Sequence, residues 1–302
     1  MLNAAVLENF VTEGRNAASA DIDSCSALEI VTIINNEDKK VPAAVEKALP
    51  EIAALVDEAA SAFRRGGRLV YLGAGTSGRL GVLDASECPP TYGVDPGMVV
   101  GLIAGGEKAL THSVESVEDD AELGVSQLKE INFNARDVLV GITASGQALY
   151  VLGALKYAAG LGAVTAAISC NKNAKVFECA RHRLCAEAGP EVVAGSTRMK
   201  AGTAQKLILN MISTGAMIRI GKVYKNLMVD MTPVNQKLVL RSIRIIGEAA
   251  GCPLAEAEKA FIASGKKTKT AIVMLLTGTD RERAEALLRE SGGRIGGIQG
   301  II

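Results

Sequence analysis

Three short stretches of glycine, serine and threonine have the composition of an anion-binding site. They are Gly73-Ala-Gly-Thr-Ser-Gly78, Gly141-Ile-Thr-Ala-Ser-Gly146 and Gly195-Ser-Thr-Arg-Met-Lys200. Each joins an expected strand to an expected helix. The first turn of a helix presents free N–H groups and a partial positive charge, and hydroxyl side chains add further donors to a phosphate. One such loop is more often only a helix cap, but three in one chain predict a site for a phosphorylated small molecule.

The first loop also fits a second class of ligand. Gly73, Gly75 and Gly78 match the G-x-G-x-x-G pattern of dinucleotide-binding proteins. That pattern needs an acidic residue about 20 positions further on, at the end of the second strand, to bind the ribose. The second expected strand ends in Leu102-Ile-Ala-Gly-Gly106, which has no acid, so we favour a phosphate monoester. The residues expected to bind it are Thr76, Ser77, Gly78, Thr143, Ser145, Gly146, Ser196, Thr197 and Lys200, although Lys200 fits a structural role on its helix equally well.

The elements that must position these loops alternate along the chain. Short apolar segments are followed by segments with helical spacing, which predicts a doubly wound, mostly parallel sheet covered on both faces. We expect a helical lead-in at residues 1–49, an α/β domain at 50–223 and a small helical module at 233–302. The expected strands are Arg68–Leu72, Met98–Ala104, Asp137–Ile142, Ala163–Ser169 and Arg183–Glu187.

Composition excludes several other functions. Of the 302 residues, 33 are Lys or Arg and 33 are Asp or Glu, so no net positive field exists to attract nucleic acid or an anionic membrane. No apolar stretch approaches the roughly 20 residues that a membrane-spanning helix needs. Six scattered cysteines without a C-x-x-C pair, and only two histidines, argue against a disulfide framework or a metal site. We therefore expect a cytoplasmic protein that binds neither nucleic acid nor membrane and holds no metal.

Two long motifs resemble the signature of the N-acetylmuramic acid 6-phosphate etherases. They are Gly75-Thr-Ser-Gly-Arg-Leu-Gly-Val-Leu-Asp-Ala-Ser-Glu-Cys-Pro-Pro-Thr-Tyr92 and Gly195-Ser-Thr-Arg-Met-Lys-Ala-Gly-Thr-Ala-Gln-Lys206, and the similarity covers nearly the whole chain. The resemblance implies the sugar isomerase (SIS) fold, a flavodoxin-like sandwich that forms homodimers, with a C-terminal module similar to a ubiquitin-associated domain. It also implies cleavage of the D-lactyl ether of N-acetylmuramic acid 6-phosphate to N-acetylglucosamine 6-phosphate and D-lactate, in amino-sugar catabolism and cell-wall recycling, without a cofactor.

The implied reaction, elimination of lactate followed by addition of water, needs proton transfer at C2 and at the departing oxygen. The resemblance assigns this work to Glu87, as proton donor to the leaving group, and to Glu118. Because Cys88-Pro89-Pro90 follows, we expect the helix to end at Glu87 and to hold it near the loops. Without the resemblance, the acidic run Glu115-Ser-Val-Glu-Asp-Asp120 around Glu118 would indicate only a solvent-exposed surface. One departure concerns the second loop, where Gln147 stands in place of the arginine of many relatives.

Two alternatives use the same phosphate loops. An SIS-type aldose–ketose isomerase would move a proton through an enediol and needs no acid directed at C3. A non-catalytic phosphosugar sensor, similar to the glucokinase regulatory protein, is usually longer and has two SIS units, whereas this chain has room for one. The presence of both Glu87 and Glu118 favours a catalytic role over a sensor, and release of D-lactate from the muramic substrate would separate the etherase from the isomerase.

Overall fold

The computed structural model describes residues 10–301, which form two compact units. The first unit contains the described residues up to Ser86 together with Gly97–Ser213, and the second contains Glu87–Pro96 together with Thr214 onward. The N-terminal segment expected at 1–49 belongs to the first unit, and its first nine residues lie outside the described part. Within residues 10–301, no helix is both long and apolar enough to cross a membrane.

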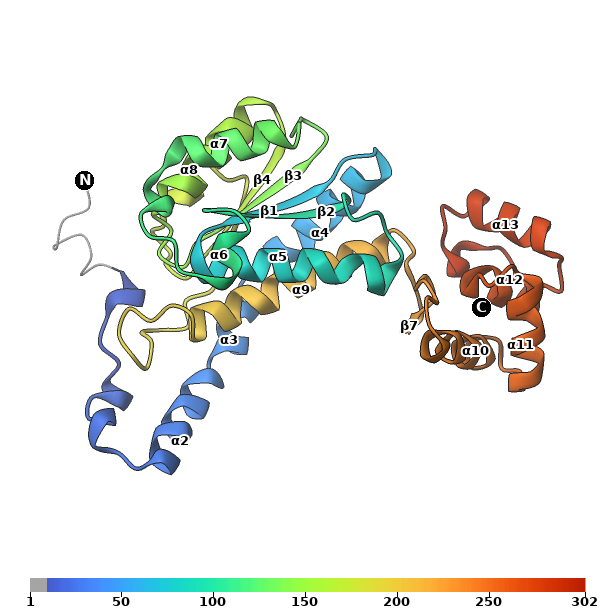
Figure 1. The fold of residues 1–302 in the computed structure, drawn as a ribbon, viewed down its shortest axis with the longest axis horizontal. Helices are drawn as coiled ribbons and strands as arrows, with labels where there is room; N and C mark the ends of the chain where they lie inside the picture. Colours follow the sequence, from blue (N-terminus) through green and yellow to red (C-terminus); the bar gives the residue numbers. More distant parts are fainter. Residues whose placement is uncertain (1–9, 302) are drawn as a thin grey trace. The chain divides into compact units, whose positions relative to one another are not determined.

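A five-stranded parallel sheet forms the centre of the first unit, with strand order β2-β1-β3-β4-β5 (Figure 1). All five expected strands are confirmed, with ends within two residues of those predicted. Because every strand runs the same way, all their carboxyl ends lie at one edge of the sheet. The strands are β1 Leu69–Gly73, β2 Val99–Ile103, β3 Val138–Ile142, β4 Val164–Ser169 and β5 His182–Cys185.

Helices cover both faces of this sheet, as expected for a doubly wound fold. Residues 41–64 form two helices, and Pro50 stands in the first turn of the second one, where its missing N–H costs nothing. The helices of this part are α2 Ala27–Asp38, α3 Val41–Glu46, α4 Leu49–Arg64, α5 Gly75–Tyr92, α6 Lys108–Thr111, α7 Ala121–Glu130, α8 Leu149–Gly160 and α9 Lys200–Arg219, with short 3-10 turns at Val11–Glu13, Ala17–Ser19, Ile22–Ser24, Val117–Asp119 and Lys175–Glu178.

Successive residues of β1 point to opposite faces and anchor different helices. Val70 and Leu72 belong to a buried cluster with Tyr150 and Val151 of α8, whereas Tyr71 packs under Gly81 of α5. A Cβ at Gly81 would lie 3.0 Å from the Tyr71 Cβ atom, so glycine lets α5 lie directly on the strand. The helices that carry the expected loops are thereby held at fixed positions above the sheet edge.

The second unit is helical apart from a short hairpin. In the described part of the chain, four helices follow the hairpin, and the core of this unit includes Ile246, Phe261 and Ile272. The glycine-rich end packs onto it through Ile295 and Ile298, which are 2% and 4% exposed. The elements are β6 Val223–Tyr224, β7 Leu227–Met228, α10 Gln236–Ala250, α11 Leu254–Ala263, α12 Thr268–Thr277, α13 Arg281–Glu290 and a 3-10 turn at Ile295–Gly297; the sequence pattern did not indicate the hairpin.

Candidate functional site

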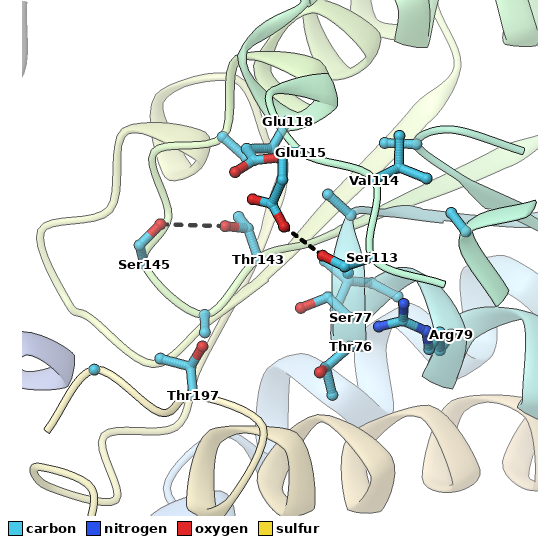
Figure 2. A pocket seen from close by; sticks show the side chains of 18 of the residues that line it. Thr76, Ser77, Arg79, Ser113, Val114, Glu115, Glu118, Thr143, Ser145 and Thr197 are labelled. Atoms are coloured by element: carbon cyan, nitrogen blue, oxygen red, sulfur yellow. Dashed lines mark hydrogen bonds between the residues drawn. The ribbon is translucent and has the colours of Figure 1, made fainter. Parts of the chain in front are cut away.

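A pocket of about 310 Å³ opens at the carboxyl edge of the sheet in the first unit (Figure 2). Its wall includes residues that directly follow β1, β2 and β3, which is where ligands of open parallel sheets bind. The expected phosphate-binding side chains that line it come from all three loops and are Thr76, Ser77, Thr143, Ser145 and Thr197. Within residues 10–301, no group of three His, Cys, Asp or Glu side chains is arranged to hold a metal ion.

The first turn of α5 supplies one side of the pocket. The N–H groups of Gly75, Thr76 and Ser77 precede the first hydrogen bond within the helix, so they are available to an anion. The Ser77 hydroxyl donates to the side-chain oxygen of Gln205 at 3.0 Å, and Gln205 is 1% exposed. A glutamine amide turned by 180° would instead donate to Ser77 and free its hydroxyl hydrogen for a ligand. Gln205 therefore controls which way this hydroxyl points.

The floor of the pocket beside α5 is main chain. Gly75 has φ of +54°, a backbone conformation that favours glycine. At Gly78, an added Cβ would lie 2.4 Å from the carbonyl oxygen of Gly73. Gly78 therefore lets the backbone of strand and helix come together without lining the pocket, whereas Gly75 lines it and provides the turn into the helix.

The second loop holds its hydroxyls by local hydrogen bonds. Thr143 accepts from the Gly146 N–H at 3.3 Å, and Ser145 accepts from the Gln147 N–H at 3.3 Å. Gly146 has φ of +77°, and a Cβ there would lie 2.1 Å from the Ala174 Cβ atom. The loop thus has a fixed shape that points Thr143 and Ser145 into the pocket, while the neighbouring Gln147 is buried and lines no part of it.

The third loop differs from the expectation. Thr197 lines the pocket, but Ser196 does not, and the N-terminus of α9 is already occupied. Both carboxylate oxygens of the buried Glu191 accept hydrogen bonds, from the N–H groups of Lys200 and Ala201, each at 2.9 Å. A protein carboxylate therefore stands where we expected a phosphate.

Lys200 is not a phosphate ligand in this arrangement, and the structural role is the one observed. Its side chain is 1% exposed, and its ammonium donates to Glu37 at 2.7 Å and to the Ala188 carbonyl at 2.8 Å. Burial by itself would raise the pKa of Glu37, but hydrogen bonds from Lys200, Lys40 and Asn16 outweigh it and hold that pKa at about 2. Lys200 and Glu37 thus form a buried ion pair that joins α2 to α9.

Two glutamates lie on the segment that closes the pocket above the first and second loops. Glu115 and Glu118 both line it, and Ser113 donates a hydrogen bond to Glu115. Between them, Ser116 has φ of +64°, which is uncommon for a residue other than glycine. Figure 2 shows the side chains of Glu115 and Glu118 among those that line the pocket. Two carboxylates beside a set of hydroxyls can carry out the proton transfers of an elimination.

Glu87 is not among the residues that line this pocket. The expectation that Pro89 and Pro90 end the helix is wrong, because α5 continues to Tyr92. Glu87 is exposed and lies ten positions after Ser77, about 15 Å along an α-helix.

A single guanidinium also lines the pocket. Arg79 lies on α5, and its Nε and Nη2 atoms donate to the carbonyls of Leu110 and His112, at 3.2 and 3.0 Å. It thereby ties the start of the segment that carries Glu115 and Glu118 to the helix of the first loop.

Comparison with known proteins identifies the family. Residues 51–159 match the sequence model of the glucokinase regulatory protein N-terminal SIS domain. Over 289 residues the chain is 56% identical to the N-acetylmuramic acid 6-phosphate etherase of Photorhabdus laumondii, which covers 96% of each chain. It is 57% identical to the corresponding etherase of Escherichia coli O1:K1 / APEC, covering 96% of this chain and 97% of that one. This chain belongs to the N-acetylmuramic acid 6-phosphate etherase family.

Among solved structures, a phosphoheptose isomerase from Francisella tularensis superposes with a TM-score of 0.49 and 16% identity. The superposition covers 64% of this etherase-family chain and 100% of the isomerase chain. The resemblance stated from the two motifs is confirmed by the curated relatives. The regulatory-protein match concerns only the central part of the chain, whereas the etherases match almost all of it.

For this etherase-family chain, the sequence analysis named Glu118 and five of the hydroxyls that line the pocket but did not select Glu115, Arg79 or Glu13. Glu115 shares the acidic run of Glu118, and Arg79 directly follows the first loop, so neighbouring motifs could have indicated both. Gln205 lies in the second family motif, but its contact with Ser77 depends on the tertiary fold.

Proposed function

We propose that this pocket is where the chain cleaves the D-lactyl ether of N-acetylmuramic acid 6-phosphate, giving N-acetylglucosamine 6-phosphate and D-lactate. In the open-chain sugar, the C2 proton is acidic because the resulting negative charge spreads onto the C1 aldehyde. A base removes that proton, the C3–O bond breaks as an acid protonates the departing lactate oxygen, and water then adds to C3 of the unsaturated aldehyde. The observation that supports this assignment is Glu118 beside the hydroxyl-lined pocket, in a chain 56% identical to etherases.

The hydroxyls and the α5 N-terminus bind the 6-phosphate in this proposal. Thr76, Ser77, Thr143 and Ser145 supply donors, and the free N–H groups of α5 supply the partial positive charge. Glu118 takes the C2 proton or activates the incoming water. The reaction as written needs no oxidant or reductant.

Glu87 remains the proposed proton donor to the leaving group, and its exposed position determines how it would have to act. Glu87 is exposed and does not line the pocket of the first unit, and in this proposal it reaches the substrate from a second copy of the chain. The proposal therefore includes a homodimer in which each site combines Glu118 of one subunit with Glu87 of the other.

Subunit mixing tests this arrangement. Glu87→Gln and Glu118→Gln should each abolish D-lactate release while N-acetylglucosamine 6-phosphate still binds. When equal amounts of the two inactive variants exchange subunits, half the dimers are mixed and each mixed dimer has one intact site, so about a quarter of wild-type activity should return.

Three results would contradict parts of the proposal. Absence of D-lactate release by the wild-type chain would remove the activity itself. Activity that does not return on mixing would place both carboxylates in one chain. Near-normal turnover of Glu87→Gln together with an inactive Glu115→Gln would transfer the acid role to Glu115, which already lines the pocket beside Glu118.

A further inference from the structure

The charge balance of the pocket is unusual for a site that takes an anionic sugar. Its charged lining residues among the described part of the chain are three carboxylates, Glu13, Glu115 and Glu118, and one cation, Arg79. N-acetylmuramic acid 6-phosphate carries two anionic groups, the phosphate and the carboxylate of the lactyl ether. Hydroxyls and backbone N–H groups can hold the phosphate, but the carboxylate enters a space that already contains negative side chains.

The guanidinium of Arg79 has donors left for a carboxylate. A guanidinium presents five N–H groups, and the edge formed by Nε and Nη2 is taken by the carbonyls of Leu110 and His112. Among residues 10–301, Nη1 has no hydrogen-bond partner, and Nη2 has a second hydrogen. The edge formed by Nη1 and Nη2 is thus open, and its spacing matches the two oxygens of a carboxylate.

Arg79 and Ser77 are positioned to contact different parts of a ligand. Residues two apart on a helix do not face the same side, and here Ser77 bonds Gln205 of α9 while Arg79 bonds the segment before Glu115. Figure 2 shows Ser145 and Arg79 at opposite sides of the pocket. A phosphate shared by the first and second loops therefore leaves Arg79 for another group of the substrate.

We propose that Arg79 binds the carboxylate of the lactyl group and thereby selects a lactyl ether over other phosphorylated amino sugars. This inference rests on the proposed function. The bond to the carboxylate offsets its repulsion by Glu115 and Glu118, and it places the ether oxygen on the side of the pocket where those acids lie. After the C3–O bond breaks, the same contact holds lactate until it leaves.

The test compares ligands with and without this carboxylate; the 3-O-ethyl ether of N-acetylglucosamine 6-phosphate lacks the carboxylate alone. Arg79→Met should lower kcat/KM for N-acetylmuramic acid 6-phosphate by roughly 10- to 150-fold, the range for a lost charge-assisted hydrogen bond. The inhibition constants of N-acetylglucosamine 6-phosphate and of its 3-O-ethyl ether, which both lack the carboxylate, should stay within about twofold. Arg79→Lys keeps the positive charge but loses the two parallel N–H donors of the guanidinium. Its kcat/KM should therefore lie between those of the wild type and Arg79→Met.

The control is Arg181→Met, which removes an exposed arginine of the same unit that pairs with Glu58 at 2.9 Å. It should leave the kinetics and the thermal unfolding temperature unchanged. Equal weakening of all three ligands by Arg79→Met would overturn the proposal, because it would show that Arg79 binds the phosphate that they share or only positions the Leu110–His112 segment. If Arg79→Met does not fold, the same three ligands measured with Arg79→Lys test the proposal. Failure of the wild-type chain to release D-lactate is a separate result that concerns the proposed function.

Discussion

Replacing Lys200 by methionine separates a structural role from a role in substrate binding. Lys200 and Glu37 are 1% and 4% exposed at their side chains, and their charged atoms lie 2.7 Å apart. Removing the ammonium would leave a buried carboxylate without its main counter-charge and the Ala188 carbonyl without its donor. Loss of one partner of a buried ion pair costs about 3–5 kcal/mol, so the free energy of unfolding of the first unit should fall by that amount.

Urea denaturation followed by circular dichroism measures this change, and KM for the phosphorylated substrate is measured under conditions in which the variant is folded. We expect KM to stay within about twofold, because Lys200 does not line the pocket. Lys40→Met is the matched control. It removes the other lysine that pairs with Glu37, but Lys40 is 60% exposed, so its loss should cost less than about 1 kcal/mol.

The same pair predicts a pH dependence. The pKa of Glu37 is about 2 in the folded chain against an ordinary value of 4.5. A lowered pKa stabilises the folded state fully above pH 4.5, and this contribution disappears as the pH falls from 4.5 towards 2. The stability difference between the wild type and Lys200→Met should shrink across that interval. A variant of unchanged stability with KM raised tenfold would refute the reasoning and return Lys200 to the phosphate.

Three further predictions concern the loops and the buried thiols. Ser77→Ala and Ser145→Ala should each raise KM about tenfold with little change in kcat in steady-state assays, because phosphate binding is mostly the same in ground and transition states. Gly78→Ala should destabilise the first unit by more than about 2 kcal/mol in urea denaturation, since its Cβ would overlap the Gly73 carbonyl. Burial raises the pKa of Cys170 to about 12, and partial burial raises that of Cys185 to about 11, so mass spectrometry should find both alkylated by iodoacetamide at pH 8 much more slowly in the folded chain than in the unfolded chain.

The strands and the C-terminal helices could be predicted because their signals are local. Strands buried on both faces are continuous apolar runs, as in Leu69–Gly73 and Val138–Ile142. Helix α10 begins at the capping residue Asn235 and ends at Gly251, which has the left-handed conformation that glycine favours. Such features depend on neighbouring residues, so a single sequence contains them.

The parts that could not be predicted depend on residues far apart in the chain. Glu37 and Lys200 are separated by 163 positions, and nothing near either residue indicates the pair. Glu191 occupies the N-terminus of α9 from nine and ten positions away, so the third loop had the composition of an anion site without a free helix end. At Pro89 and Pro90 the local signal itself was misleading. The low helix propensity of proline favours a helix end there, but α5 continues to Tyr92 in the folded chain.

The glycine contacts under α5 have a consequence for how such sites diverge. Where the Gly73 carbonyl and the Gly78 backbone touch, no side chain exists to be exchanged, and adding one would push strand and helix apart. The side chains that can vary are therefore those around the opening of the pocket, such as Arg79 and Glu115. Single substitutions around the pocket can therefore change which sugar such a protein accepts, whereas the contact between strand and helix beneath the pocket tolerates almost no substitution.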